Sequence, residues 1–199
     1  MFSFLKRRIS ATELADADVE GIQRNVATGY TNRVYPKDCE LPIELVKQEW
    51  LYFDVFVEDL CVFASFAKRD TRTKNAILDR FWMRIREWLT TIQVPALPER
   101  RCIDMTEWKL MPPGGIICIP AETSETAYDR VRRRGATYGA AIRTPHPLGE
   151  NYGVAKVFTS LCGGVMNAID LLAVSTYFHE RKVGFAKLVK SYRVTAPCP

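Results

Sequence analysis

The chain has 199 residues and a formal net charge of +5; 47% of its residues are hydrophobic and 26% are charged. This balance excludes an intrinsically disordered chain, which carries fewer apolar and more charged residues. A chain of this length can bury about 70% of its unfolded surface in one core, so we expect a single domain over residues 1–199.

The N-terminus combines a short apolar start with the basic residues Lys6, Arg7 and Arg8. No apolar run of signal-peptide length precedes these residues, so residues 1–9 do not indicate a secretory signal. We expect a frayed end there, with weak contact to an anionic membrane surface as the alternative.

Two helices are predicted in the first third of the chain. Ser10 and Glu13 form a capping box that marks the start of the first helix, which buries one face. The second helix extends from Ile43 to about Ala67, and its apolar residues cover most of its circumference. We therefore expect the second helix to be central. The strip with Lys47, Asp54 and Glu58 is the one part of this helix that we expect to be solvated.

The third predicted helix is amphipathic and follows the polar segment KRDTRT. Its apolar positions repeat every three or four residues and are Ile77, Phe81, Ile85, Trp88 and Ile92. Residues 94–120 contain five prolines and predict an irregular connection that is longer than most. Within it, PERRCIDMTEWK could form a short helix and GGIICIPA an extended piece between helices.

The fourth predicted helix is capped by Thr123 or Ser124 and ends near Arg143. A last helical run extends from about Glu150 to residue 178, and we expect it to bend or break within residues 179–184. A short apolar helix then closes the chain.

The stretch from residue 157 to 178 is long enough to cross a membrane, but it contains Asn167 and Asp170. A central aspartate costs about 2.5–3.5 kcal/mol on insertion, whereas each leucine, isoleucine, phenylalanine or valine returns about 0.3–0.6 kcal/mol. We therefore predict a core helix of a soluble protein and no transmembrane span.

The fourth predicted helix and the helical run that begins near Glu150 each have one face that carries only small side chains. Gly135 and Gly139 lie four residues apart on one helix, and Ser160, Gly164 and Ala168 are spaced by four on the other. Faces of this kind let helix backbones approach closely. We expect the two helices to form a tight antiparallel pair.

Asn167 and Asp170 form the polar middle of an otherwise apolar helical strip. With Trp50 and Phe53 of the second helix, they could line a pocket for a polar ligand, because a buried carboxylate needs a polar partner. The simpler alternative is an internal ion pair between Asp170 and an arginine, or plain exposure.

The basic segment YDRVRRRGATYG places Arg130, Arg133 and Arg134 on one helical face. Three guanidinium groups could bind the phosphates of an anionic partner, and Tyr128 or Tyr138 could stack on a base. Local ion pairs with Asp129 are the simpler use of these arginines, and we do not expect nucleic-acid binding. His146 lies between two prolines, which would hold it rigidly in a loop for contact with a partner.

The sequence contains no nucleophile-elbow, dinucleotide-binding or phosphate-loop motif, so we expect no catalytic residue and no cofactor. Asp54 and Glu58 could bind a metal, but neither histidine has the glutamate three residues earlier that di-iron bundles need. The six cysteines show no zinc-binding spacing. Because Cys61 and Cys162 fall in apolar stretches, we expect free thiols, no metal and a reducing, cytoplasmic location.

Together these patterns predict an all-α fold: a five- or six-helix, mostly up-and-down bundle with a proline-rich irregular segment between the third and fourth long helices. We expect a non-enzymatic module for protein interaction or regulation, with a protein partner. The alternative is a helical bundle or enzyme that binds a small molecule between its central helices. The sequence predicts no oligomeric state.

Overall fold

The computed structural model describes residues 7–35, 41–66, 70–97, 99, 101–104, 116–122, 124–144, 146–163 and 167–195. Over these ranges the protein is all-α with six helices, as predicted, and two pairs of short strands are added. The helices are α1 (Ala11–Ala27), α2 (Ile43–Phe66), α3 (Thr71–Leu89), α4 (Ala127–Arg143), α5 (Glu150–Leu161) and α6 (Ala168–Ser191). The strands are β1 (Arg7–Ser10), β2 (Arg101–Asp104), β3 (Ile116–Ile119) and β4 (Tyr192–Thr195).

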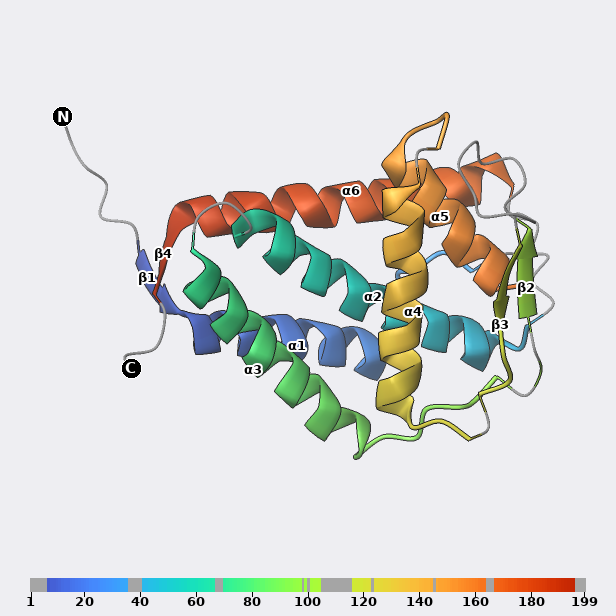
Figure 1. Cartoon of the computed structure of the whole chain (residues 1–199), viewed down its shortest axis with the longest axis horizontal. Helices are drawn as coiled ribbons and strands as arrows, with labels where there is room; N and C mark the ends of the chain where they lie inside the picture. Colours follow the sequence, from blue (N-terminus) through green and yellow to red (C-terminus); the bar gives the residue numbers. More distant parts are fainter. Residues whose placement is uncertain are drawn as a thin grey trace.

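Helix α2 is the centre of the fold, as its sequence predicted. It packs against each of the other five helices, and 15 of its 24 residues are buried. Figure 1 shows α4 crossing in front of α2, while α6 runs along the upper edge of the molecule. A helix that is apolar on nearly all sides is stable only where neighbours surround it.

Two of the three residues of the α2 strip that we expected to be solvated are buried. Asp54 and Glu58 are each only 2% exposed, whereas Lys47 is half-exposed. The prediction is wrong for the two acids because the loop after α1 and helix α6 cover them: Arg33 lies 3.6 Å from Asp54, and Arg181 forms an ion pair with Glu58. These cations compensate for the loss of water around the two carboxylates.

The ends of the described chain pair with each other. Strand β1 runs parallel to β4, with Arg7 opposite Tyr192, at one end of the helices (Figure 1). Residues 7–9 are therefore ordered rather than frayed; the rest of the N-terminal segment lies outside the described residues. The Ser10 capping box of α1 is confirmed, since the Glu13 amide donates to the Ser10 hydroxyl and the Ser10 amide to the Glu13 carboxylate.

The predicted last helix is two helices. α5 ends at Leu161, Gly163 takes a left-handed backbone conformation (φ 73°), and Asn167 caps a new helix by accepting from the Asp170 amide at 2.9 Å. No break occurs within residues 179–184, because α6 continues to Ser191. The break therefore lies where a glycine and a capping residue allow it.

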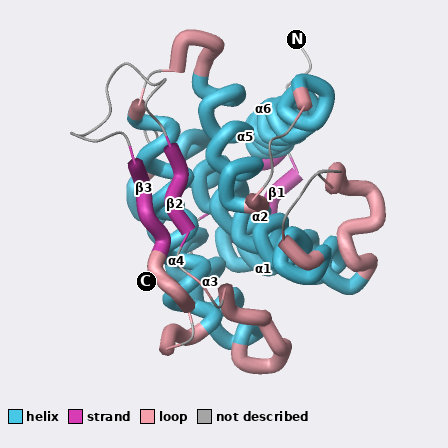
Figure 2. The backbone as a smooth tube through the Cα atoms, turned by 90° about the vertical axis from the view of Figure 1, so that its right-hand side faces the viewer, coloured by secondary structure: helices cyan, strands magenta, loops and turns pink. Residues whose placement is uncertain are grey.

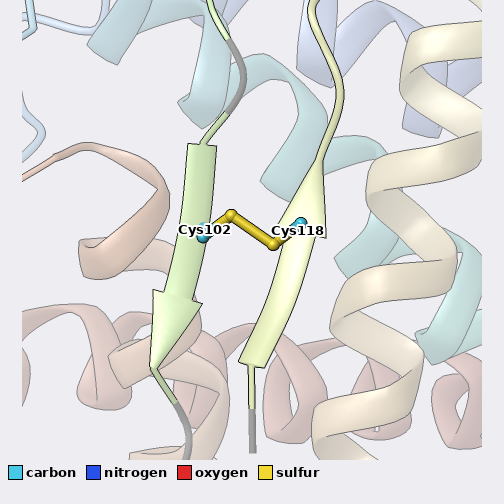
Figure 3. Close-up of a disulfide and its surroundings, with 2 residues drawn as sticks. All are labelled: Cys102 and Cys118. Atoms are coloured by element: carbon cyan, nitrogen blue, oxygen red, sulfur yellow. A yellow bond between two sulfur atoms is a disulfide. The ribbon is translucent and has the colours of Figure 1, made fainter. Parts of the chain in front are cut away.

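A disulfide joins β2 and β3, which pair antiparallel beside the helices (Figure 2). Cys102 lies directly opposite Cys118 and is bonded to it (Figure 3). The expectations of a short helix at residues 101–104 and of free thiols at these two positions are wrong, and the cysteines no longer favour a reducing compartment. Cys61 and Cys162 are buried thiols, as predicted; Cys39 and Cys198 lie outside the described residues.

Among the helices of the described ranges, none has both the length and the apolar content that a membrane span requires.

Candidate functional site

The structure places the two halves of the predicted ligand site in different environments. Trp50 and Phe53 are buried in an aromatic cluster around Phe158, with ring centroids 4.4 and 5.1 Å from that ring. Asn167 is exposed, and Asp170 lies in the first turn of α6, where its amide is capped by Asn167. Asn167 and Asp170 therefore begin a helix, while Trp50 and Phe53 pack the core.

The three predicted anion-binding arginines already have partners inside the protein. Arg134 is buried, with its Nε 2.9 Å from Glu49 and its Nη2 3.2 Å from Glu122. Burial by itself would lower the pKa of Arg134, but these two carboxylates raise it above its usual value. Arg133 pairs with Glu122 and Glu125 at 3.2 and 2.8 Å.

The third arginine, Arg130, is buried and donates to the Tyr52 hydroxyl and to the Val94 and Glu125 carbonyls. It therefore ties α4 to α2 and to the two ends of the connection between α3 and α4. Asp129 does not form the expected local ion pairs; it accepts a hydrogen bond from the Thr126 hydroxyl at the start of α4 instead. Arginines already paired within the protein offer little to an external anion, although Arg133 Nε and Arg134 Nη1 are buried without a hydrogen-bond partner.

His146 stabilises its own turn. Its Nδ1 accepts a hydrogen bond from the Leu148 amide at 3.1 Å, and its ring packs against Tyr152 at 4.7 Å between centroids. The rigid loop that the flanking prolines predicted is therefore reinforced by contacts within the chain.

The sequence did not lead us to predict a buried polar cluster that surrounds Asp54 of α2. Asp54 accepts from the Asn25 amide at 2.8 Å and from the Tyr177 hydroxyl at 2.7 Å, so it joins α1, α2 and α6. Burial raises the pKa of the Asp54 carboxyl in spite of the Arg33 charge. Burial also raises the pKa of Asp18 to about 7. Two acids one turn apart in an apolar helix were the available signal for this cluster.

One concave surface at α2 is the α2–α4 groove, a hollow of about 480 Å³ between α2, α3 and α4. Its walls are apolar side chains from these three helices: Phe56, Leu60, Phe63, Trp82, Val131 and Ile142. Phe63 is 51% exposed at the rim. A mostly apolar hollow of this volume is typical of a binding site.

The floor of the groove is made of small residues of α4: Gly135, Ala136 and Gly139. A Cβ atom added to Gly135 would meet no heavy atom within 4 Å, and one added to Gly139 would meet only the tip of Arg143, at 3.4 Å. The expectation that these glycines form a tight pair with the next helix is therefore wrong. They leave the groove open, at the cost of about 1 kcal/mol of helix propensity each. Gly164 lies outside the described residues.

Charged groups mark both ends of the groove. The Arg132 guanidinium lies over the Trp82 ring at 4.5 Å, and the Trp82 indole donates to Asp59 at 2.7 Å. Burial raises the pKa of Asp59, although the Trp82 hydrogen bond and the Arg132 charge act in the opposite direction. Arg143 is exposed at the other end and forms no ion pair with any described residue. The groove can thus hold an apolar chain and place an anionic group beside Arg143.

No group of three or more potential metal ligands occurs among the described side chains. No protein-family model, curated protein or solved structure matches the chain.

Proposed function

We propose that this protein is a non-enzymatic interaction module and that its α2–α4 groove binds an amphipathic helix of a partner protein. The observation that carries the proposal is the open floor at Gly135 beside the exposed ring of Phe63 and the half-buried ring of Trp82. Amphipathic helices bind such grooves by inserting apolar residues spaced by three or four positions. The small residues of the floor, Gly135, Ala136 and Gly139, leave room for those side chains.

The charges of the groove support an acidic partner. Arg132 and Arg143 lie 11 residues apart on α4, which corresponds to about 16 Å along a helix. A partner helix of about three turns covers this length, and an acidic residue near its end would pair with Arg143. The Asp59 carboxylate already accepts a hydrogen bond from the Trp82 indole inside the groove. It therefore does not cancel the positive charge of Arg132 and Arg143 at the rim.

Photo-crosslinking from the wall of the groove tests the proposal. A benzophenone amino acid in place of the half-exposed Phe63 should form a crosslink to one protein in native extract. Gly135→Trp should abolish that crosslink because its side chain fills the groove. Gly184→Trp is the matched control, since a Cβ at Gly184 of α6 also meets nothing within 4 Å. A crosslink that is equally strong in Gly135→Trp would refute the proposal.

A second candidate is binding of a small anionic amphiphile, favoured by the volume of about 480 Å³ and by Arg143, which forms no ion pair with any residue that the structure describes. Dodecanoate should then raise the melting temperature of the wild-type protein and not that of Gly135→Trp. Stabilisation by dodecanoate without any protein crosslink would favour this second candidate over the first.

A further inference from the structure

Strands β1 and β4 bring basic residues from the two ends of the described chain together. Arg8 lies directly opposite Arg193 in the parallel pair, and both side chains are exposed. The next register pair, Ile9 and Val194, packs against the core. Because side chains alternate between the two faces of a strand, Arg8 and Arg193 project together from the face that points away from the core.

The pairing of two arginines carries an electrostatic cost. Neighbouring strands lie about 5 Å apart, and like charges directly opposite each other destabilise a sheet. Neither Arg8 nor Arg193 forms an ion pair with a residue that the structure describes. Two acids lie near the sheet, but Glu13 belongs to the capping box of α1 and Asp70 caps α3. An anion from outside the chain, bound between the two guanidinium groups, would remove this cost.

Three more cations adjoin this pair in the chain. Arg7 precedes Arg8 in β1, and Lys187 and Lys190 lie in the last turns of α6, directly before β4. All three are exposed, and none has an ion-pair partner within the described ranges. Together with Arg8 and Arg193 they form the terminal basic surface. The two strands lie at one end of the helices (Figure 1), so the bundle does not block a flat surface that approaches from this end.

We propose that the terminal basic surface binds the anionic phospholipids of a membrane surface. Each lysine or arginine close to an anionic bilayer adds to the attraction. The cations of the N-terminal segment alone would bind weakly, but the strand pairing adds those of the C-terminal segment to them. Leu188, which lies between Lys187 and Lys190 in the chain, is 41% exposed and can enter the boundary between head groups and acyl chains.

The same surface lacks a feature that nucleic-acid interfaces use. Proteins that bind single strands stack the bases on aromatic side chains. Tyr192 is the one aromatic residue of β1 and β4, and it is half-buried on the strand face that carries Val194. Phospholipid head groups need no such stacking and are the better match. The surface shares no residue with the α2–α4 groove, so the inference does not depend on the proposed function.

Cosedimentation with vesicles tests the proposal. The wild-type chain should bind vesicles of phosphatidylcholine and phosphatidylserine but not vesicles of phosphatidylcholine alone, and sodium chloride should weaken the binding. Arg8→Gln combined with Arg193→Gln should lower the partition coefficient at least about tenfold. This double variant should keep its melting temperature, because the change removes a repulsion and no ion pair within the described chain.

The matched control combines Arg24→Gln with Arg86→Gln and removes the same charge elsewhere. Both arginines are exposed, and Arg24 lies in the last turn of α1, about 20 Å along the helix from β1. Charges at that distance are screened, so the partition coefficient should stay within about twofold of the wild type. Lys187→Gln combined with Lys190→Gln is a second test variant in case the first fails to fold.

Five results would overturn the proposal. A wild-type chain that binds neither kind of vesicle, or both equally, excludes an attraction to anionic lipid. A folded test variant that binds like the wild type excludes this surface. A lower melting temperature in the variant of Arg8 and Arg193 would contradict the repulsion between them. An equal loss in the control would assign the binding to net charge alone. Equally tight binding to single-stranded RNA would assign the surface to nucleic acid.

Discussion

Replacing Arg134 with methionine should lower the free energy of unfolding by about 3–5 kcal/mol, the usual cost of removing one partner from a buried ion pair. Arg134 is buried between Glu49 and Glu122, at 2.9 and 3.2 Å. Methionine fills a similar volume but leaves both carboxylates without this cation. Glu49 would keep only the hydrogen bond from Tyr138, at 2.6 Å, and Glu122 would keep Arg133.

Urea unfolding followed by circular dichroism measures this change. For a chain of this size each kcal/mol corresponds to about 2–4 °C in melting temperature, so a thermal melt should show a drop of about 6–20 °C. Arg143→Met is the matched control on the same helix, because Arg143 is exposed and has no ion pair to any described residue. Its effect should stay within about 0.5 kcal/mol.

Comparison of the two variants distinguishes an arginine that stabilises the fold from an arginine that is free to bind a partner. A loss below about 1 kcal/mol for Arg134→Met, the size expected for an exposed pair, would refute the role assigned to the buried network. An equal loss in the free energy of unfolding in Arg134→Met and Arg143→Met would show that stability depends on any arginine of α4 rather than on the buried ion pairs. That result would also contradict the prediction.

Two further predictions concern pH and the disulfide. Burial raises the pKa of Asp18 to about 7 from an ordinary 3.8, so between these two pH values the folded state holds a proton that the unfolded state loses, and stability falls across this range until it levels off above pH 7. Asp18→Asn should therefore raise the melting temperature most at about pH 8, less at about pH 5 and little at about pH 3.5; an equal change at all three values contradicts this. The Cys102–Cys118 disulfide spans 16 positions, and its removal in the double serine variant should cost about 3 kcal/mol in urea unfolding. Dithiothreitol should destabilise the wild type to the same extent and leave the variant unchanged, whereas an effect of dithiothreitol on the variant would point to another cause.

The parts of the candidate site could be found from the sequence, but their roles could not. The pattern of Gly135 and Gly139 correctly identified a face of α4 without side chains. Whether such a face meets a helix or an open groove depends on where α2 and α3 lie, which the spacing of two glycines does not specify. Arg134 was likewise found as a cation on a helix, but its buried partner Glu49 lies 85 positions earlier in the chain.

The sequence by itself determined the all-α fold, the start of α1 and the central position of α2. Capping residues and apolar periodicity act within a few turns of one helix, so they can be recognised without knowledge of the neighbours. Tertiary structure alone decided that Asp54 and Glu58 are buried, that Cys102 and Cys118 are bonded, and that the α2–α4 groove is open. These features depend on groups far apart in the chain, because the burial of a charge is stable only where distant elements supply its partners.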